Sequence, residues 1–200
     1  MGVLLLLHSC RLSSRCDACE GGTRAATLFE LALPGSAYLY QGKELGLHEV
    51  GDIADDARQD PTFFRNPGAS RGRDGCRVPL LWTENGASFG FGEGPAHLPQ
   101  PDWFGDVSVE AQDGDPASTL TLYRKALHLR RQLQTAENLT WVDELSNGEV
   151  IAFARSNGWV TMTNFGDEPV ALPAGEVLIT SSPLDKAGLR PGSTTVWLKV

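Results

Sequence analysis

The hydrophobic pattern near the start of the chain predicts a helix followed by a strand. Residues 24–33 are almost wholly apolar, with a polar residue only at every third position, so we expect a largely buried helix there. Pro34-Gly35 would end this helix, and the aromatic-rich residues 37–41 then predict a short buried strand. A strand buried on both faces needs parallel neighbours, and no segment before residue 117 supplies them. This helix–strand unit is therefore incomplete.

The middle of the chain predicts a long loop and then a second helix. Residues 42–116 hold most of the prolines and show no sustained period, and a loop so far beyond about 12–15 residues is tolerated mainly where it is functional. Asp115-Pro116 offers an N-cap and an N1 proline for an amphipathic helix over residues 117–134. Arg130 and Arg131 would suit the C-terminal end of this helix. Its apolar positions recur at i, i+4, i+7 and i+11, at Leu122, Ala126, Leu129 and Leu133.

After Thr135 the hydrophobic period changes to two. Short segments rich in β-branched and aromatic residues are separated by turn pairs such as Asn147-Gly148 and Asn157-Gly158. We expect an antiparallel sandwich or meander of about 65 residues, small but sufficient when it packs on a neighbouring domain. The predicted segments lie near Leu139–Val142, Val150–Ala154, Trp159–Asn164, Pro169–Leu172, Glu176–Ser181 and Thr194–Val200.

Composition and charge exclude several classes of protein. The 200 residues include 17 Lys and Arg against 25 Asp and Glu, a formal net charge of −8, and 41% are hydrophobic. Such a chain can bury a core, which argues against a disordered protein, and it has no Lys/Arg-rich run of the kind that binds nucleic acid. No apolar stretch approaches the ~18 residues of a membrane span. The leucine run at residues 3–7 lacks a basic start and a cleavage site, so we expect no membrane contact and a cytoplasmic location.

Residues 1–22 form an atypical head in which no helical or strand period continues. We expect this head to be disordered. Side chains within it could supply nitrogen and sulfur ligands to zinc, but a structural zinc site normally has a second half-site roughly 12 or more residues away. A head with free thiols is the alternative, and we expect neither a metal nor a cofactor. The potential ligands are His8, Cys10, Cys16 and Cys19.

Two motifs in the long loop make the chain resemble a known family. Residues 34–46, Pro-Gly-Ser-Ala-Tyr-Leu-Tyr-Gln-Gly-Lys-Glu-Leu-Gly, resemble a segment at the eighth barrel strand of the alpha-amylase superfamily (glycoside hydrolase family 13). Residues 71–82, Arg-Gly-Arg-Asp-Gly-Cys-Arg-Val-Pro-Leu-Leu-Trp, resemble a segment of its alpha-glucosidase and oligo-1,6-glucosidase branch. Together with residues 57–61, the form of the segment at residues 71–82 resembles that of actinobacterial alpha-glucosidases. The resemblance covers about residues 23–200.

The resemblance implies an α+β fragment. Residues 23–135 would be the last helix–strand–helix portion of a TIM (β/α)8 barrel, with the long eighth strand-to-helix loop at the C-terminal face, where barrel active sites lie. Residues 136–200 would be an all-β C-terminal sandwich domain. Alone, the fragment would expose barrel-facing surface on residues 24–33 and 37–41, which predicts aggregation or chaperone dependence.

The resemblance also implies a sugar-binding role for one arginine of the loop. In the family, an arginine of this segment helps to form the floor of the first sugar subsite; Arg77 is the position that matches, and Arg73 is the less favoured match. A guanidinium suits this task because its fixed fork can hold a carboxylate and sugar hydroxyls. Alternatively, Arg73, Asp74 and Arg77 only hold the loop together through internal ion pairs.

We expect supporting roles for the other polar and aromatic residues near this arginine. Trp82 and Trp103 could stack on a sugar, although a loop tryptophan more often packs as a local anchor. For Glu44, a hydrogen-bonded support of the loop fits better than acid–base chemistry. The residues expected to support the loop are Asp74, Trp82, Tyr40, Gln41 and Glu44.

The chemistry of the family depends on carboxyl groups that we do not find in this sequence. Retaining hydrolysis needs a nucleophile and an acid/base, and in the family these lie on earlier strands. A third aspartate, in an Asn-His-Asp segment, should fall near residues 7–10, which read Leu-His-Ser-Cys. The acidic residues between 44 and 60 lack a cavity that would raise one pKa. We assign no catalytic residue and expect an inactive C-terminal fragment of an alpha-glucosidase-like glycoside hydrolase.

Two other functions stay open. The chain could be a non-catalytic sugar-binding or accessory module, in which Trp141, Trp159 and Trp197 form a stacking face, although tryptophans at strand positions fit a core better. It could also complement a separately encoded N-terminal barrel portion. In each case the implied ligand is an alpha-glucoside or a malto-oligosaccharide.

Overall fold

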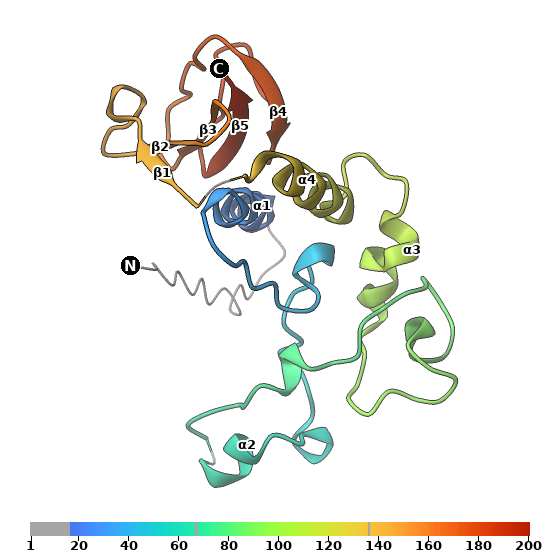
Figure 1. Ribbon diagram of the computed structural model, residues 1–200. Helices are drawn as coiled ribbons and strands as arrows, with labels where there is room; N and C mark the ends of the chain where they lie inside the picture. Colours follow the sequence, from blue (N-terminus) through green and yellow to red (C-terminus); the bar gives the residue numbers. More distant parts are fainter. Residues whose placement is uncertain (1–16, 67, 136) are drawn as a thin grey trace. The chain divides into compact units, whose positions relative to one another are not determined.

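The computed structural model describes residues 17–66, 68–135 and 137–200, with side chains from residue 21 onwards. The described chain divides into two compact units (Figure 1). The first joins residues 17–39 to residues 122–200, and the second comprises residues 40–121. The fold is of the α+β class, and each unit has its own hydrophobic core.

The first unit is built on one five-stranded antiparallel sheet with the strand order β1-β2-β3-β5-β4. The first three strands form a meander, and β5 returns beside β3. Alternating apolar and β-branched residues explain these strands, since every other side chain faces a covered side. The strands are β1 Leu139–Trp141, β2 Val150–Arg155, β3 Trp159–Asn164, β4 Glu176–Thr180 and β5 Thr194–Lys199. Five of the six predicted β segments are therefore strands.

The predicted sandwich is wrong in one respect, because the described residues form a single sheet. The sixth predicted segment, Pro169–Leu172, contributes only an isolated bridge between Val170 and Leu189. Prolines at 169, 173, 183 and 191 remove ladder donors and prevent a second regular sheet. The loops nevertheless cover one face of the sheet, where they enclose Val150, Ala152, Met162, Leu189, Val196 and Leu198.

Two helices cover the other face of the sheet, α1 Asp17–Ala32 and α4 Thr119–Leu133 (Figure 1). The indole nitrogen of Trp197 on β5 donates to the main-chain oxygen of Leu28 at 3.1 Å, which links sheet and helix. The hydroxyls of Thr27 and Tyr123 lie 2.8 Å apart and link the helices. The shared core comprises Leu28, Leu31, Ala32, Leu122, Ala126, Phe153, Trp159, Ile179 and Trp197.

The bounds of both helices differ from the sequence-based expectation. α1 begins at Asp17, inside the segment predicted to be a disordered head; the Gly21-Gly22 pair, which lowers helix propensity, does not interrupt it. α4 begins at Thr119 instead of 117, and its cap is Ser118, whose hydroxyl accepts from the N–H of Thr121 at 3.1 Å. Asp115 instead accepts from the N–H of Ala117 and forms a turn before the helix.

Two arginines cap the C-terminal end of α1. Arg130 of α4 donates to the main-chain oxygens of Leu31 and Leu33, the latter at 2.9 Å, and Arg155 of β2 donates to that of Ala32. Helix C-terminal carbonyls have no partner within the helix and carry partial negative charge. Burial lowers the pKa of both guanidinium groups. Arg130 lies in the last turn of α4 as predicted, but its side-chain hydrogen bonds go to the end of α1.

The buried strand predicted at 37–41 is absent. Residues 36–40 form no regular secondary structure and pair with no strand, and Tyr38 is 76% exposed. The physical reason is that no other strand of the described chain offers it hydrogen bonds. The expected apolar exposure thus occurs at Tyr38, Leu39 and Tyr40. It does not occur on α1, where no residue from 23 to 32 is exposed.

The second unit consists of loops and short helices around a small core, as expected for a long segment without a period. The 3-10 helices η1 Lys43–Leu45 and η2 Asp55–Ala57 precede α2 Pro61–Arg65, and η3 Asp74–Cys76 follows it. Further along lie η4 Ala87–Gly90, η5 Asp102–Val107 and α3 Val109–Gln112. Its core comprises Leu45, Ile53, Val78, Leu81, Leu98, Phe104 and Leu120.

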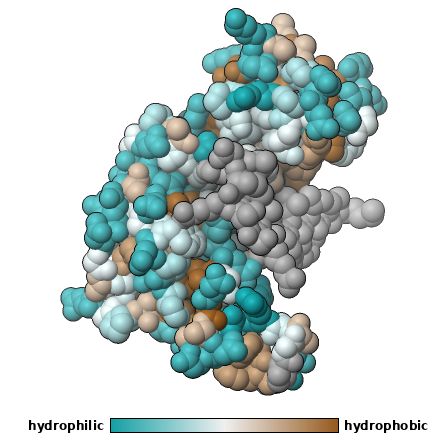
Figure 2. Space-filling view, turned by 180° about the vertical axis from the view of Figure 1, so that it is seen from behind, coloured by the Kyte–Doolittle hydropathy of each residue, from teal (hydrophilic) through white to brown (hydrophobic). Residues whose placement is uncertain are grey.

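No helix among the described residues has the length and apolar character needed to cross a membrane. Outside the grey atoms, Figure 2 shows hydrophilic side chains over much of the visible surface, with apolar residues in scattered patches.

Candidate functional site

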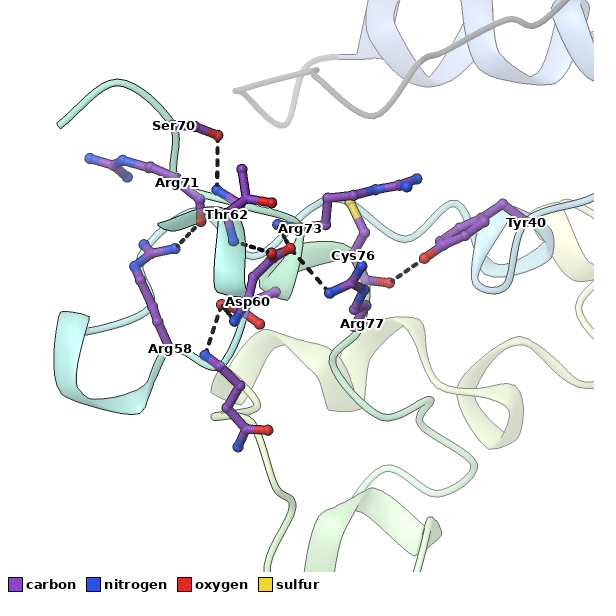
Figure 3. Close-up of polar contacts among 12 residues, drawn as sticks. Tyr40, Arg58, Asp60, Thr62, Ser70, Arg71, Arg73, Cys76 and Arg77 are labelled. Atoms are coloured by element: carbon purple, nitrogen blue, oxygen red, sulfur yellow. Dashed lines mark hydrogen bonds and ion pairs between the residues drawn. The ribbon is translucent and has the colours of Figure 1, made fainter. Parts of the chain in front are cut away.

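The side chain of Asp60 is the centre of a polar network in the second unit (Figure 3). Its Oδ1 accepts from the main-chain N–H of Thr62 at 2.8 Å and so caps α2. Its Oδ2 accepts from the main-chain N–H of Arg73 at 2.7 Å and from Nη1 of Arg77 at 3.1 Å. The N–H of Thr62, the N–H of Arg73 and, to a smaller extent, the charge of Arg77 lower the pKa of Asp60 against the opposing effect of burial. The carboxylate is therefore held in its ionised form.

A second carboxylate fixes the main chain beneath the first. Asp74 is buried, and its Oδ2 accepts from the main-chain N–H groups of Gln59 and Asp60, each at 3.1 Å. The next residue must be glycine, because a Cβ atom on Gly75 would lie 2.4 Å from the main-chain oxygen of Val50. Asp74 thus binds the main chain at residues 59 and 60.

Arg58 joins separate parts of the same loop. Its guanidinium is buried and donates to the main-chain oxygens of Arg71 at 2.9 Å and Ile53 at 2.8 Å. The same group lies 3.4 Å from the carboxylate of Asp55 and 5.0 Å from the ring centre of Phe63. A buried charge needs partners of this kind, and a guanidinium offers several donors in one plane. Arg58 therefore holds the loop closed.

Arg77 and Arg73 differ in how the structure uses them. The side chain of Arg77 is 48% exposed, and Asp60 holds it from one side. Its remaining N–H groups make no hydrogen bond with any other described residue. Arg73 contributes its main-chain N–H to Asp60, and its exposed side chain makes no described contact. Arg77 does form an internal ion pair, but its partner is Asp60 and not Asp74, and part of the guanidinium stays exposed.

The residues at the start of the loop converge on Cys76. The hydroxyl of Tyr40 and the amide nitrogen of Gln41 each lie 3.4 Å from the main-chain oxygen of Cys76, next to Arg77. Both side chains are exposed, so these long hydrogen bonds are weak. Glu44 lies in η1 and is half-buried, without a side-chain contact in the described network. Two of these three residues therefore approach the candidate site.

The two loop tryptophans are in different environments. Trp103 is half-buried and packs edge-to-face on Phe104 at 4.7 Å, as a local anchor would. Trp82 is 51% exposed, and its main chain is held by Phe89, whose oxygen accepts from the N–H of Trp82 at 2.8 Å. Phe89 itself has a φ of 47°, rare for an aromatic residue. A strained turn thus supports the exposed indole.

Sequence reasoning missed Asp60 and Arg58 as the residues that organise the site. The sequence does contain a signal for Asp60, because Asp60-Pro61 is the same pair of N-cap aspartate and N1 proline as Asp115-Pro116. For Asp60 the cap is real, since its carboxylate bonds the N–H of Thr62. No local pattern indicates the long-range bonds of Arg58.

The sequence also offers two other candidate clusters, a set of zinc ligands and a tryptophan face. The described residues contain no group of His, Cys, Asp and Glu that could hold a metal ion. The residues considered as zinc ligands, at positions 8–19, lie outside the described side chains. Of the three tryptophans proposed as a stacking face, Trp159 and Trp197 are buried and only Trp141 is exposed, at 58%. The core interpretation is correct for the first two.

Comparison with known protein families shows where this chain belongs. The family described as "Alpha amylase, catalytic domain" matches residues 8–138, more than half of the chain. The chain belongs to the alpha-amylase family. The match includes residues 8–22, predicted to be an atypical head, and it ends at residue 138.

Similar curated proteins are alpha-glucosidases and related enzymes. A probable alpha-glucosidase of Rhizobium meliloti is 34% identical over 131 residues, which is 64% of this chain and 23% of that protein. The salivary alpha-glucosidase of Anopheles gambiae is 29% identical over 193 residues, 90% of this chain and 30% of that protein. The chain thus spans no more than about a third of the length of these relatives.

Solved structures of similar enzymes also match this chain. The alpha-glucosyl transfer enzyme XgtA is 30% identical, with a TM-score of 0.70, over 90% of this chain and 35% of that one. The trehalulose synthase MutB has a TM-score of 0.70 over 90% of this chain and 38% of that one; at 24% identity it supports the fold alone.

Proposed function

We propose that this chain is the C-terminal part of an alpha-glucosidase-like glycoside hydrolase of the actinobacterial type. In this proposal residues 23–135 are the end of the catalytic TIM barrel and residues 136–200 form the C-terminal domain. The end of the family match at residue 138 supports that division. The alpha-glucosidase relatives support an alpha-glucoside or malto-oligosaccharide as the ligand of the intact protein.

One observation carries the proposal, namely that Arg77 is half-exposed and held by the buried carboxylate of Asp60. A guanidinium fixed on one side presents its other N–H groups at a defined angle, which suits binding of sugar hydroxyls. The segment that holds it, residues 71–82, is the one that resembles the alpha-glucosidase branch. In this proposal Arg77 contacts the sugar, and Tyr40, Gln41 and Asp74 support the loop around it.

Sugar contact by Arg77 can be tested on the 200-residue chain by ligand-observed NMR with maltose. We expect saturation transfer to maltose from the wild-type chain and its loss in Arg77→Gln. Arg65→Gln is a matched control, because Arg65 is an exposed arginine in α2 of the same unit. Equal transfer from both variants would show that maltose binds elsewhere and would overturn the role of Arg77.

We propose further that the 200-residue chain hydrolyses no alpha-glucoside by itself. Retaining hydrolysis needs two carboxyl groups on either side of the glycosidic bond, and the two buried carboxyl groups of the loop are engaged otherwise: Asp60 and Asp74 bind main-chain N–H groups. The test is an assay with an aryl alpha-glucoside on the chain purified from a host without alpha-glucosidases. Turnover above that of a mock purification would overturn this part of the proposal.

A second candidate function is complementation of a separate N-terminal barrel portion. Tyr38, Leu39 and Tyr40 favour it, because they are exposed and have no strand partner in the described chain. Co-expression with the Rhizobium meliloti relative shortened by its matching C-terminal region would test it. Restored alpha-glucosidase activity that Leu39→Asp abolishes supports complementation, and the absence of activity with the wild-type chain contradicts it.

A further inference from the structure

The carboxylate of Asp60 has more partners than a helix cap requires. Its side chain is 5% exposed, and it bonds the N–H of Thr62, the N–H of Arg73 and Nη1 of Arg77. A serine or an asparagine would suffice as N-cap of α2. The second carboxylate oxygen, Oδ2, accepts hydrogen bonds only from Arg73 and Arg77, in the segment that carries Arg77 (Figure 3).

We propose that Asp60 is a positioning residue that sets the direction of the Arg77 guanidinium for contact with a sugar. This inference rests on the proposed function, in which Arg77 contacts the ligand. An arginine side chain loses considerable rotamer freedom when it is fixed. If Asp60 fixes the Arg77 side chain before the sugar arrives, the entropy cost of ordering this side chain is not part of the binding step. The affinity for the sugar is then higher.

The place of Asp60 is itself determined by its neighbours. Asp74 binds the main-chain N–H of Asp60, and Gly72 leaves space for its side chain, since a Cβ atom at position 72 would lie 2.7 Å from the Cβ of Asp60. The backbone N–H of Arg73 then approaches the carboxylate directly. Two carboxylates thus act in series: Asp74 orders the main chain at residue 60, and Asp60 orders Arg77.

The direct test compares Asp60→Asn and Asp60→Ser with the wild-type chain. Both variants retain an N-cap oxygen for α2, but they remove the negative oxygen that faces Arg77. The readout is the ¹⁵N heteronuclear NOE of Arg77 Nε, which reports the order of this side chain on the ps–ns timescale. Asp56→Asn is the matched control, because Asp56 is an exposed aspartate of η2 in the same loop.

We expect an ordered Arg77 Nε in the wild type and in Asp56→Asn, and a mobile one in both Asp60 variants. Maltose affinity should fall about tenfold in the Asp60 variants, the factor that corresponds to loss of one modest interaction. A lower unfolding temperature with Arg77 still ordered would show that Asp60 is only structural, and would overturn the inference. A mobile Arg77 together with a wild-type chain that does not bind maltose would instead overturn the proposed function while confirming that Asp60 orders Arg77.

Discussion

Arg130 of α4 donates a hydrogen bond to the main-chain oxygen of Leu33, at 2.9 Å, just beyond the C-terminal end of α1. The side chain therefore stabilises a helix separated from it by about a hundred residues of sequence. Tertiary caps of this kind are invisible to helix propensity, which considers only neighbours along the chain.

Replacement of Arg130 by alanine should lower the free energy of unfolding by about 2 kcal/mol, because charged hydrogen bonds to partly buried carbonyl groups are lost. Chemical denaturation monitored by circular dichroism measures the change. Arg131→Ala is the control: Arg131 is the exposed next residue, and its loss should cost less than about 0.5 kcal/mol. Equal effects of the two substitutions would contradict the cap.

The two buried tryptophans of the sheet should respond differently to replacement by phenylalanine. The indole nitrogen of Trp197 bonds Leu28, whereas that of Trp159 is buried and has no hydrogen-bond partner among the described residues. Trp197→Phe removes the hydrogen bond that links the sheet to the helix, while Trp159→Phe removes an unsatisfied donor. We expect the first to cost at least about 1 kcal/mol more than the second in denaturant unfolding. A larger cost for Trp159→Phe would refute this interpretation.

Stability should depend on Asp60 in acid. Its pKa in the folded protein is lowered from the ordinary 3.8, so the ionised carboxylate contributes stability at pH above about 4, and that contribution is lost as the pH falls through and below 3.8. The unfolding temperature of the wild type should be nearly flat between pH 7 and 5 and fall below pH 4. Asp60→Asn should be less stable at pH 7 and show a shallower acid decline, whereas Asp56→Asn should follow the wild type.

Gly75→Ala should loosen the loop that carries Arg77. The new methyl group would lie 2.4 Å from the main-chain oxygen of Val50, a contact that must be relieved by moving the main chain. We expect a loss of about 2 kcal/mol and faster proteolytic cleavage within residues 42–78. Gly51→Ala is the matched control, since nothing lies within 4 Å of its added Cβ. Unchanged proteolysis in Gly75→Ala would contradict the close approach.

The sequence predicted regular structure well wherever the pattern was local. Alternation placed β3 at its exact bounds, Trp159–Asn164, and the apolar repeat placed α4 within two residues at its start. The buried strand predicted around Tyr38 is wrong because a strand depends on partners that are not local in the sequence. Residues with strand propensity form a strand only where neighbouring strands complete their hydrogen bonds, and the described chain contains none beside them.

Less of the candidate site could be predicted. The family resemblance points to Arg77 and Asp74, and the structure gives each a partner that the resemblance does not name: Asp60 for Arg77, and the main chain at residues 59 and 60 for Asp74. These bonds join residues 14–17 positions apart across an irregular loop. No helical or strand period operates over such a loop, so sequence pattern alone could not find them.

The two outer strands of the sheet bear on how this protein behaves at high concentration. β1 has only three residues, and the pairing of β4 with β5 shifts register between Val177 and Ile179. A short or irregular outer strand presents few consecutive main-chain groups in the geometry that another strand could match. Sheet-to-sheet growth into fibrils is therefore disfavoured at both ends of the sheet.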